Sequence, residues 1–277
     1  MLTASLNMPP ILDPNAPIGV FDSGLGGLTV VKQVIQFLPN ERIVYFGDTA
    51  RVPYGTKSAD TIIRYARQVV KVLQQHKVKV IVVACNTASA LALDILAKEI
   101  KIPMIGVIAP GARKAVLCTK TKKIGIIATS STIRSGAYVA EIKAIDKNIK
   151  VVSQACPLFV PLVEEGWFDH EVTYKVAEEY LAAIKKAKVD SLILGCTHYP
   201  LLKNVLHSCM GPKVNLIDSA EEVAAQVRQL LMEKKILRTQ LSPAQHTFLV
   251  SDEPELFKCM AQKFLGGGVK EVIKVNV

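Results

Sequence analysis

Two cysteines of this chain lie in matching sequence contexts. The segments VIVVACNTASA, residues 80–90, and SLILGCTHYPL, residues 191–201, each place a cysteine between an apolar run and a short polar cluster. A single cysteine in such a place is most often a small buried residue. A thiol at a strand-to-helix turn, however, loses its proton more readily, because unpaired backbone N–H groups stabilise the thiolate. The repeated context therefore favours a functional role for the thiols of Cys85 and Cys196 over a purely structural one.

Other residues that could exchange protons stand near the same motifs. His198 follows Cys196 by two positions, and an imidazole can take or give a proton near neutral pH. Asp22 ends an apolar run in the motif DSGLGG, where a buried carboxylate could act on a neighbouring thiol. The glycines of this motif permit close backbone approach, and Ser23 with the following amides would suit a substrate carboxylate. The alternative for DSGLGG is a helix-capping turn.

Two further motifs have the character of binding segments. GDTARVPYG, residues 47–55, predicts a loop after a short strand, with Tyr54 and Gly55 at its tip, and the alternative is an ordinary surface turn. PLVEEGW, residues 161–167, carries Glu164 and Glu165 in an apolar stretch, and one of them is expected to face a cleft. The remaining cysteines lack such neighbours and are interpreted as structural: Cys118, Cys156, Cys209 and Cys259.

Short apolar strands that alternate with amphipathic helices must position these residues. The strands are mostly continuous in Val and Ile, which is typical of parallel strands buried on both faces. We expect them at residues 18–21, 43–46, 80–84, 104–107, 124–128, 150–153, 192–194, 214–217, 247–250 and 272–275. Helical periodicity predicts helices over residues 58–76, with Ser58 as N-cap, and over 171–187 and 220–235.

This alternation predicts an α/β fold with two doubly wound parallel sheets. IGVFDSGLGGLTV, from Ile18, resembles IGIIATSSTIRSG, from Ile124, and each cysteine follows its segment at a similar distance. The sequence therefore predicts two similar domains. Ligands of open α/β sheets bind beyond the carboxyl ends of the strands, so both cysteines are expected to look into one cleft between facing domains.

Composition and charge exclude several classes of protein. Six cysteines in 277 residues, without a CxxC pair, do not suit a disulfide scaffold or a zinc site. The first basic residue is Lys32, and no apolar run approaches the roughly 18 residues that cross a bilayer, so we expect a cytoplasmic protein with reduced thiols and no membrane contact. The net charge of +10 comes from dispersed lysines, which suits capture of small anions better than specific nucleic-acid binding.

Five motifs together resemble those of the cofactor-independent aspartate/glutamate racemase superfamily, and within it the glutamate racemases. They are FDSGLGG, GDTARVPYG, ACNTASA, CPLFVPLVEEG and LGCTHYP, in this order between about residues 18 and 219. The resemblance implies two α/β domains with the active site between them, built from residues 1–109 plus 219–277 and from 110–218. It also implies turnover without pyridoxal phosphate, metal or nucleotide.

The same resemblance assigns roles to residues. Cys85 and Cys196 would be the two acid/base groups, with Asp22 assisting the first cysteine and His198 the second, and Glu164 would match the glutamate of the PLVE stretch. The positions that match substrate contacts are Asp22, Ser23, Tyr54, Gly55, Asn86, Thr87, Thr197 and His198. Such a protein would interconvert L- and D-glutamate for peptidoglycan synthesis in a bacterial cytoplasm, and a homodimer is expected. The alternatives are an aspartate or hydantoin racemase, or a basic non-catalytic protein that binds nucleic acid or a topoisomerase.

Overall fold

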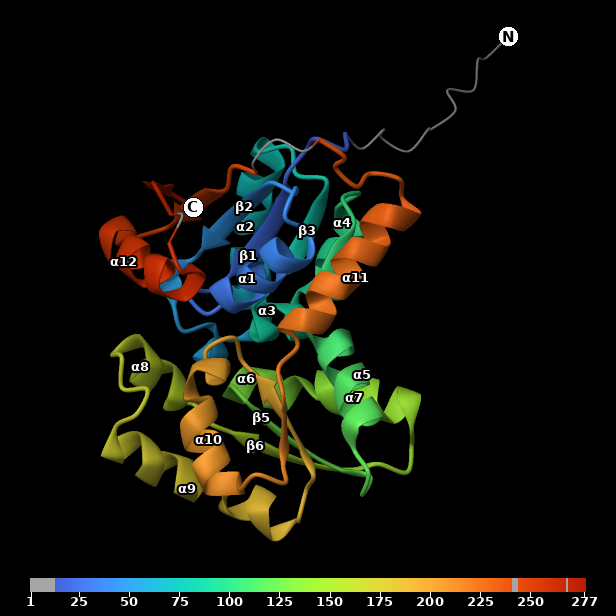
Figure 1. Ribbon diagram of the computed structural model, residues 1–277, viewed down its shortest axis with the longest axis vertical. Coiled ribbons are helices and arrows are strands. Elements are labelled where there is room, and N and C mark those ends of the chain that lie inside the picture. Colours follow the sequence, from blue (N-terminus) through green and yellow to red (C-terminus); the bar gives the residue numbers. More distant parts are fainter. Residues whose placement is uncertain (1–12, 241–243, 268) are drawn as a thin grey trace.

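Two parallel β-sheets with helices on both faces form the framework of the protein (Figure 1). The computed structural model describes residues 13–240, 244–267 and 269–277. The α/β architecture with two doubly wound parallel sheets, expected from the sequence, is confirmed. Residues 1–12, the larger part of the proline-rich N-terminal segment, lie outside the described residues.

The first sheet has six strands in the order β10-β9-β2-β1-β3-β4, and every neighbouring pair is parallel. Its strands are β1 (Ile18–Asp22), β2 (Ile43–Gly47), β3 (Val80–Val83), β4 (Met104–Gly106), β9 (Thr247–Val250) and β10 (Val272–Lys274). In the register of β1 and β3, Phe21 pairs with Val83, so Asp22, the last residue of β1, and Cys85, which follows β3, lie at the same edge of the sheet. Chain segments from both ends of the protein build this sheet.

The second sheet has four parallel strands in the order β6-β5-β7-β8. They are β5 (Lys123–Ala128), β6 (Lys150–Ala155), β7 (Ser191–Gly195) and β8 (Asn215–Ile217). Ala128 pairs with Gly195, so that Thr129 and Cys196 follow the carboxyl ends of neighbouring strands. All ten strands predicted from the sequence are present, with bounds that differ by no more than two residues.

Helices cover both sheets. Those associated with the first sheet are α1 (Leu28–Phe37), α2 (Ala59–Gln75), α3 (Asn86–Leu91), α4 (Leu93–Glu99), α11 (Ala220–Glu233) and α12 (Pro254–Leu265). Those associated with the second are α5 (Ile108–Cys118), α6 (Ser130–Ser135), α7 (Ala137–Ile145), α8 (Phe159–Glu164), α9 (Glu171–Lys186) and α10 (Lys203–Met210). Short 3₁₀ turns complete the chain: η1 (Thr49–Arg51), η2 (Tyr54–Thr56) and η3 (Tyr199–Leu202). The predicted N-cap of α2 is confirmed, since the Ser58 side chain accepts a hydrogen bond from the Thr61 N–H.

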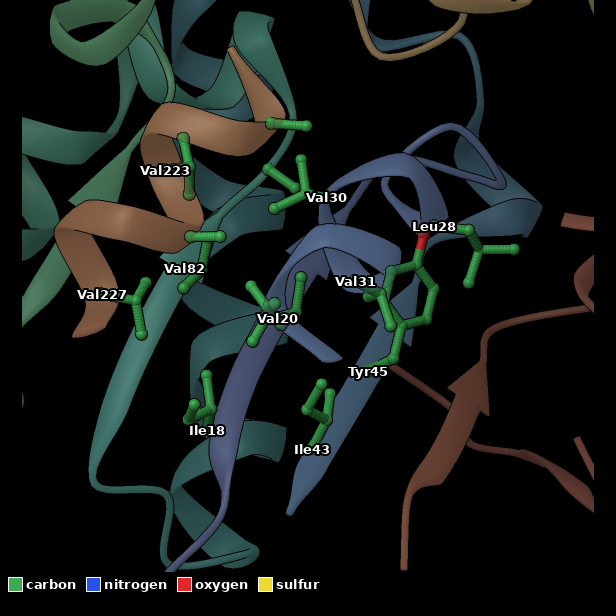
Figure 2. Packing of buried hydrophobic residues seen from close by; sticks show 14 of the residues in the cluster. Ile18, Val20, Leu28, Val30, Val31, Ile43, Tyr45, Val82, Val223 and Val227 are labelled. Carbon is green, nitrogen blue, oxygen red and sulfur yellow. The ribbon is translucent and has the colours of Figure 1, made fainter. Parts of the chain in front are cut away.

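Each sheet separates two apolar cores, which is why its strands are apolar on both faces. In the first sheet, Val20 and Val82 pack toward α1 and α11, where Val223 and Val227 complete the cluster (Figure 2). Phe21, the next residue along β1, points to the opposite core under α2 and α3. Helix α11 thus returns the chain from the second sheet to the first.

Candidate active site

The carboxyl ends of the two sheets meet at one cavity. Ser23, Tyr54, Cys85, Asn86 and Thr87 line it from the first sheet, and Thr129, Cys196, Thr197 and His198 line it from the second. Cys85 is the N-cap residue of α3 and Cys196 lies between β7 and η3, with exposed fractions of 4% and 7%. The structure therefore brings both cysteines, predicted from their matching contexts, to the wall of a single buried cavity.

Cys85 lies beside a buried carboxylate and a hydroxyl. Its thiol donates to Ser23 Oγ at 3.5 Å. Asp22 is fully buried, and its Oδ2 accepts hydrogen bonds from the N–H groups of Gly24, at 3.1 Å, and Gly27, at 2.9 Å. Burial raises the pKa of Asp22 above its usual value. Burial, together with the negative charge of Asp22, raises the pKa of Cys85 to about 12, so this group is a thiol at neutral pH.

Cys196 lies beside an imidazole instead. Its Sγ is 3.7 Å from His198 Nδ1, and His198 Nε2 contacts the Glu164 carboxylate on the other side of the ring. Burial alone would lower the pKa of His198, but the hydrogen bonds to Cys196 and Glu164 and the negative charge at both partners raise the pKa well above its usual range. The imidazole can therefore hold the proton that Cys196 gives up. Glu165, the alternative acid of this stretch, is exposed, whereas Glu164 is partly buried against His198.

The glycine motif after β1 allows the two halves to approach each other. A Cβ atom at Gly26 would stand 2.4 Å from Thr197 Oγ1, and one at Gly27 would stand 2.5 Å from Asp22 Cβ. Thr197 Oγ1 in turn donates to Asp22 Oδ1 at 3.2 Å. These glycines therefore permit close approach to Asp22 and to the loop that carries Cys196. The close backbone approach to a ligand that the motif also predicts stays a prediction.

The PYG loop also contacts the second sheet, but Tyr54 does not lie at an exposed tip. Its side chain is 1% exposed, its hydroxyl donates to the Asp48 carboxylate, and its ring packs edge-on to Phe21. Gly55 abuts Thr129 so closely that a Cβ there would be 2.3 Å from Thr129 Cβ. Tyr54 and Gly55 both line the cavity from its wall.

Hydroxyl and amide groups complete the cavity. Thr87 Oγ1 lies 2.9 Å from Thr129 Oγ1 and 3.2 Å from Thr132 Oγ1, so α3 and α6 are joined by hydroxyl groups. Sequence analysis did not identify Thr129, which lines the cavity. A signal was present: when Ile18 and Ile124 are superimposed in sequence, Thr129 takes the place of Ser23. The other lining residues that were missed are Val52, Pro53 and Val160.

No cluster of three or more His, Cys, Asp or Glu side chains suited to a metal ion occurs among residues 13–240, 244–267 and 269–277. Within the same ranges no helix combines the length and the apolar character that a membrane span requires.

Comparison with known proteins agrees with this geometry. Residues 18–227 match the family Asp/Glu/Hydantoin racemase. A curated glutamate racemase of Geobacter metallireducens is 50% identical over 264 residues, which cover 95% of this chain and 98% of that protein. The crystal structure of glutamate racemase isoform RacE1 from Bacillus anthracis superimposes with a TM-score of 0.91 at 40% identity, covering 95% of this chain and 98% of that one.

A second solved structure, glutamate racemase from Francisella tularensis in complex with D-glutamate, has a TM-score of 0.88 at 43% identity, covering 95% of this chain and 98% of that chain. The family match spans both sheets, from β1 to the middle of α11. It includes both cysteines, Asp22, Glu164 and His198. The chain therefore belongs to the Asp/Glu/Hydantoin racemase family.

Proposed function

We propose that this protein is a glutamate racemase in which Cys85 and Cys196 transfer the Cα proton between the two faces of the substrate. The observation that carries the proposal is the pair of buried cysteines that line one cavity, Cys85 from the first sheet and Cys196 from the second. Asp22 serves Cys85, and His198, held by Glu164, serves Cys196. Relatives named glutamate racemase at 45–50% identity support the choice of substrate.

The geometry suits inversion at a carbon atom. One thiolate removes the proton from one face of Cα, and the thiol on the other wall delivers a proton to the opposite face. The substrate need not turn over between these steps. Burial and the charge of Asp22 raise the pKa of Cys85, whereas Cys196 lies beside the imidazole of His198, so the two cysteines have different partners for proton exchange. Such assistance by positioned acids and bases contributes about 10²–10⁴-fold to a rate.

Glutamate would be held by the polar lining. Hydroxyl groups of Ser23, Thr87 and Thr197 and the Asn86 amide present donors to carboxylates. A cysteine in its thiol form adds no negative charge to a site that must admit an anionic substrate. The full set of proposed contacts is Asp22, Ser23, Tyr54, Gly55, Asn86, Thr87, Thr197 and His198.

The proposal also covers the fate of the product, the oligomeric state and the domain boundaries. The product, D-glutamate, would enter peptidoglycan synthesis in the cytoplasm. The chain would form a homodimer, which light scattering at several concentrations tests. Its two domains would comprise residues 1–109 plus 219–277 and residues 110–218, a division supported by the strands that each sheet contains.

Two alternatives are tested by direct assays. An aspartate or hydantoin racemase would turn over L-aspartate or a hydantoin faster than L-glutamate. A likeness to an aspartate racemase of Picrophilus torridus, at 20% identity and a TM-score of 0.54, shows the shared fold alone. A basic nucleic-acid-binding protein without catalysis would shift DNA in a salt-dependent manner and leave L-glutamate unchanged.

Racemisation of L-glutamate in D₂O tests the proposal most sharply. If two bases act on opposite faces, the D-glutamate formed at early times carries deuterium at Cα, while unreacted L-glutamate stays mostly protiated. The reason is that the abstracted proton remains on the buried thiol and is returned to the same face. Early D-glutamate that retains protium would overturn the two-cysteine mechanism, and absence of turnover would overturn the activity itself.

A further inference from the structure

One tyrosine lies between the two halves of the site without lining the cavity. Tyr138, on α7 beside the second sheet, is 3% exposed. Its hydroxyl donates a hydrogen bond of 2.7 Å to Asn86 Oδ1, which belongs to α3 beside the first sheet. Asn86 is itself 3% exposed and lines the cavity next to Cys85. Tyr138 therefore contacts Asn86, a proposed substrate-binding residue, without lining the cavity itself.

This hydrogen bond determines which way the Asn86 amide faces. Burial raises the pKa of Tyr138 well above its usual value, so the phenol stays protonated and has a proton to donate. Within the described part of the chain the Tyr138 hydroxyl has no other hydrogen-bond partner. A buried donor without an acceptor costs about 1–3 kcal/mol, so the amide oxygen turns toward Tyr138. The Asn86 NH₂ group then faces the cavity, and no described residue accepts a hydrogen bond from it.

The Tyr138 ring is seated against glycines. A Cβ atom at Gly195 would stand 3.2 Å from Tyr138 Cε2, and one at Gly111 would stand 3.4 Å from Tyr138 Cε1. Gly195 directly precedes Cys196, and Asn86 directly follows Cys85. The Tyr138 side chain thus lies against Gly195 and hydrogen-bonds Asn86, which are the sequence neighbours of Cys196 and Cys85. Because the ring is closely packed, the hydroxyl group has little freedom to move.

We propose that Tyr138 is a positioning residue for racemisation, whose hydroxyl holds the Asn86 amide with its NH₂ group directed at a carboxylate of the substrate. A carboxylate only accepts hydrogen bonds, so an Asn86 amide in the flipped orientation would place its oxygen against a carboxylate oxygen of the substrate. The inference rests on the proposed function and adds to it a residue outside the cavity. Its effect falls on substrate binding more than on proton transfer.

The first test replaces Tyr138 by phenylalanine, which keeps the ring and removes the hydroxyl. We expect Tyr138→Phe to raise KM for glutamate about tenfold, as loss of one hydrogen bond would, while kcat changes by less than about threefold. Tyr199→Phe is the matched control, because Tyr199 is equally buried in the same half and donates to the Cys156 carbonyl at 2.8 Å. The control should leave KM unchanged. An unchanged KM in Tyr138→Phe overturns the inference.

A double-mutant cycle separates positioning from general support of the fold. Once Asn86→Ala has removed the amide, adding Tyr138→Phe should change KM by less than about twofold, because Tyr138 acts through Asn86. If the two effects multiply instead, Tyr138 acts by another route and the inference is wrong. Thermal unfolding of each variant shows whether a fall in stability accompanies the kinetic change.

Asn86→Asp tests the amide orientation without altering Tyr138. The new side chain still accepts the Tyr138 hydrogen bond but presents oxygen to the substrate, so KM should rise further than in Asn86→Ala. A KM no higher than that of Asn86→Ala would overturn the inference. Wild-type racemisation is measured first: its absence overturns the proposed function, whereas an active wild type with a normal Tyr138→Phe variant overturns only the role of Tyr138.

Discussion

Thr197 Oγ1 donates a hydrogen bond of 3.2 Å to Asp22 Oδ1, although 175 positions separate the two residues in the chain. Thr197 follows Cys196 directly, and Asp22 directly precedes Ser23, whose hydroxyl contacts Cys85. The contact is possible because Gly26 has no side chain to occupy the space beside Thr197. The carboxylate that we propose to serve Cys85 is therefore positioned partly by the loop that carries Cys196.

Asp22→Asn is expected to raise stability while it lowers activity. Burial raises the folded-state pKa of Asp22, so its ionisation above pH 3.8 favours the unfolded chain, and stability is lost as pH rises through the folded pKa. Asparagine can keep its oxygen on the Gly24 and Gly27 amides and turn its NH₂ toward Thr197. A gain of about 1 kcal/mol corresponds to a Tm increase of roughly 2–4 °C at pH 7.

Calorimetry at two pH values checks the sign of this effect. The difference in Tm between Asp22→Asn and wild type should shrink near pH 3, where the wild-type carboxyl is protonated in both states. Racemisation should fall by about 10²–10⁴-fold in the same variant. A Tm below that of wild type at pH 7 would show that the charge of Asp22 is compensated in the folded protein.

The two cysteines at the cavity should be indispensable, unlike the cysteines elsewhere. We expect Cys85→Ala and Cys196→Ala each to reduce kcat/KM by more than about 10²-fold, since each removes a proton-transfer group. Cys118→Ala and Cys259→Ala are the controls, being half-buried and exposed positions away from the cavity. All four proteins should fold, because loss of one thiol leaves a small void. Turnover near wild type in either cavity variant would remove that residue from the mechanism.

His198→Asn and Asp22→Asn should affect the two reaction directions unequally, since we propose that each residue assists a different cysteine: His198 contacts Cys196, and the charge of Asp22 acts on Cys85. The equilibrium constant for two enantiomers is one, so kcat/KM must fall by the same factor in both directions. The asymmetry can therefore show only in kcat and KM taken separately. Initial rates from L-glutamate and from D-glutamate measure it, and identical changes of both parameters in both directions, in both variants, would contradict separate roles.

The strands and the main chemical groups were predictable from sequence because their signals are local. Continuous Val and Ile runs report burial on both faces, and Ser58 lies where an N-cap is needed. The matching contexts of Cys85 and Cys196 follow from the repeated strand-to-helix step. Parallel strands then bring such residues to one edge of each sheet.

The supporting contacts were not predictable, because they join residues far apart in sequence. Tyr138 meets Asn86 across 52 positions, and that contact depends on the packing of α7 against α5 and of α5 against α3. Tyr54 was expected at a loop tip, but its hydroxyl finds a buried acceptor in Asp48 and the ring turns inward. In both cases a buried polar group had to find one particular partner, which composition and periodicity do not reveal.

Lys79 is another buried polar side chain with particular partners. It lies at the end of the first sheet opposite the cavity. Its Nζ lies 2.6 Å from Glu41 Oε2 and donates to the carbonyls of Pro14, at 2.7 Å, and Ile236, at 2.8 Å. Both charged side chains are about 1% exposed or less. Lys79 thus ties the segment before β1 and the segment after α11 to the body of the protein.

Lys79→Met is therefore expected to lower the free energy of unfolding by about 3–5 kcal/mol, because it removes the Lys79 cation from beside the buried Glu41 carboxylate. Lys274→Met is the matched control: Lys274 pairs with Asp252 at the same distance of 2.6 Å, but both side chains are about half exposed, so the loss should stay below about 1 kcal/mol. Urea unfolding measures both. The racemisation rate of folded Lys79→Met should equal that of wild type, since Lys79 does not line the cavity. Equal stability losses in the two variants would show that burial adds nothing to the Lys79–Glu41 pair.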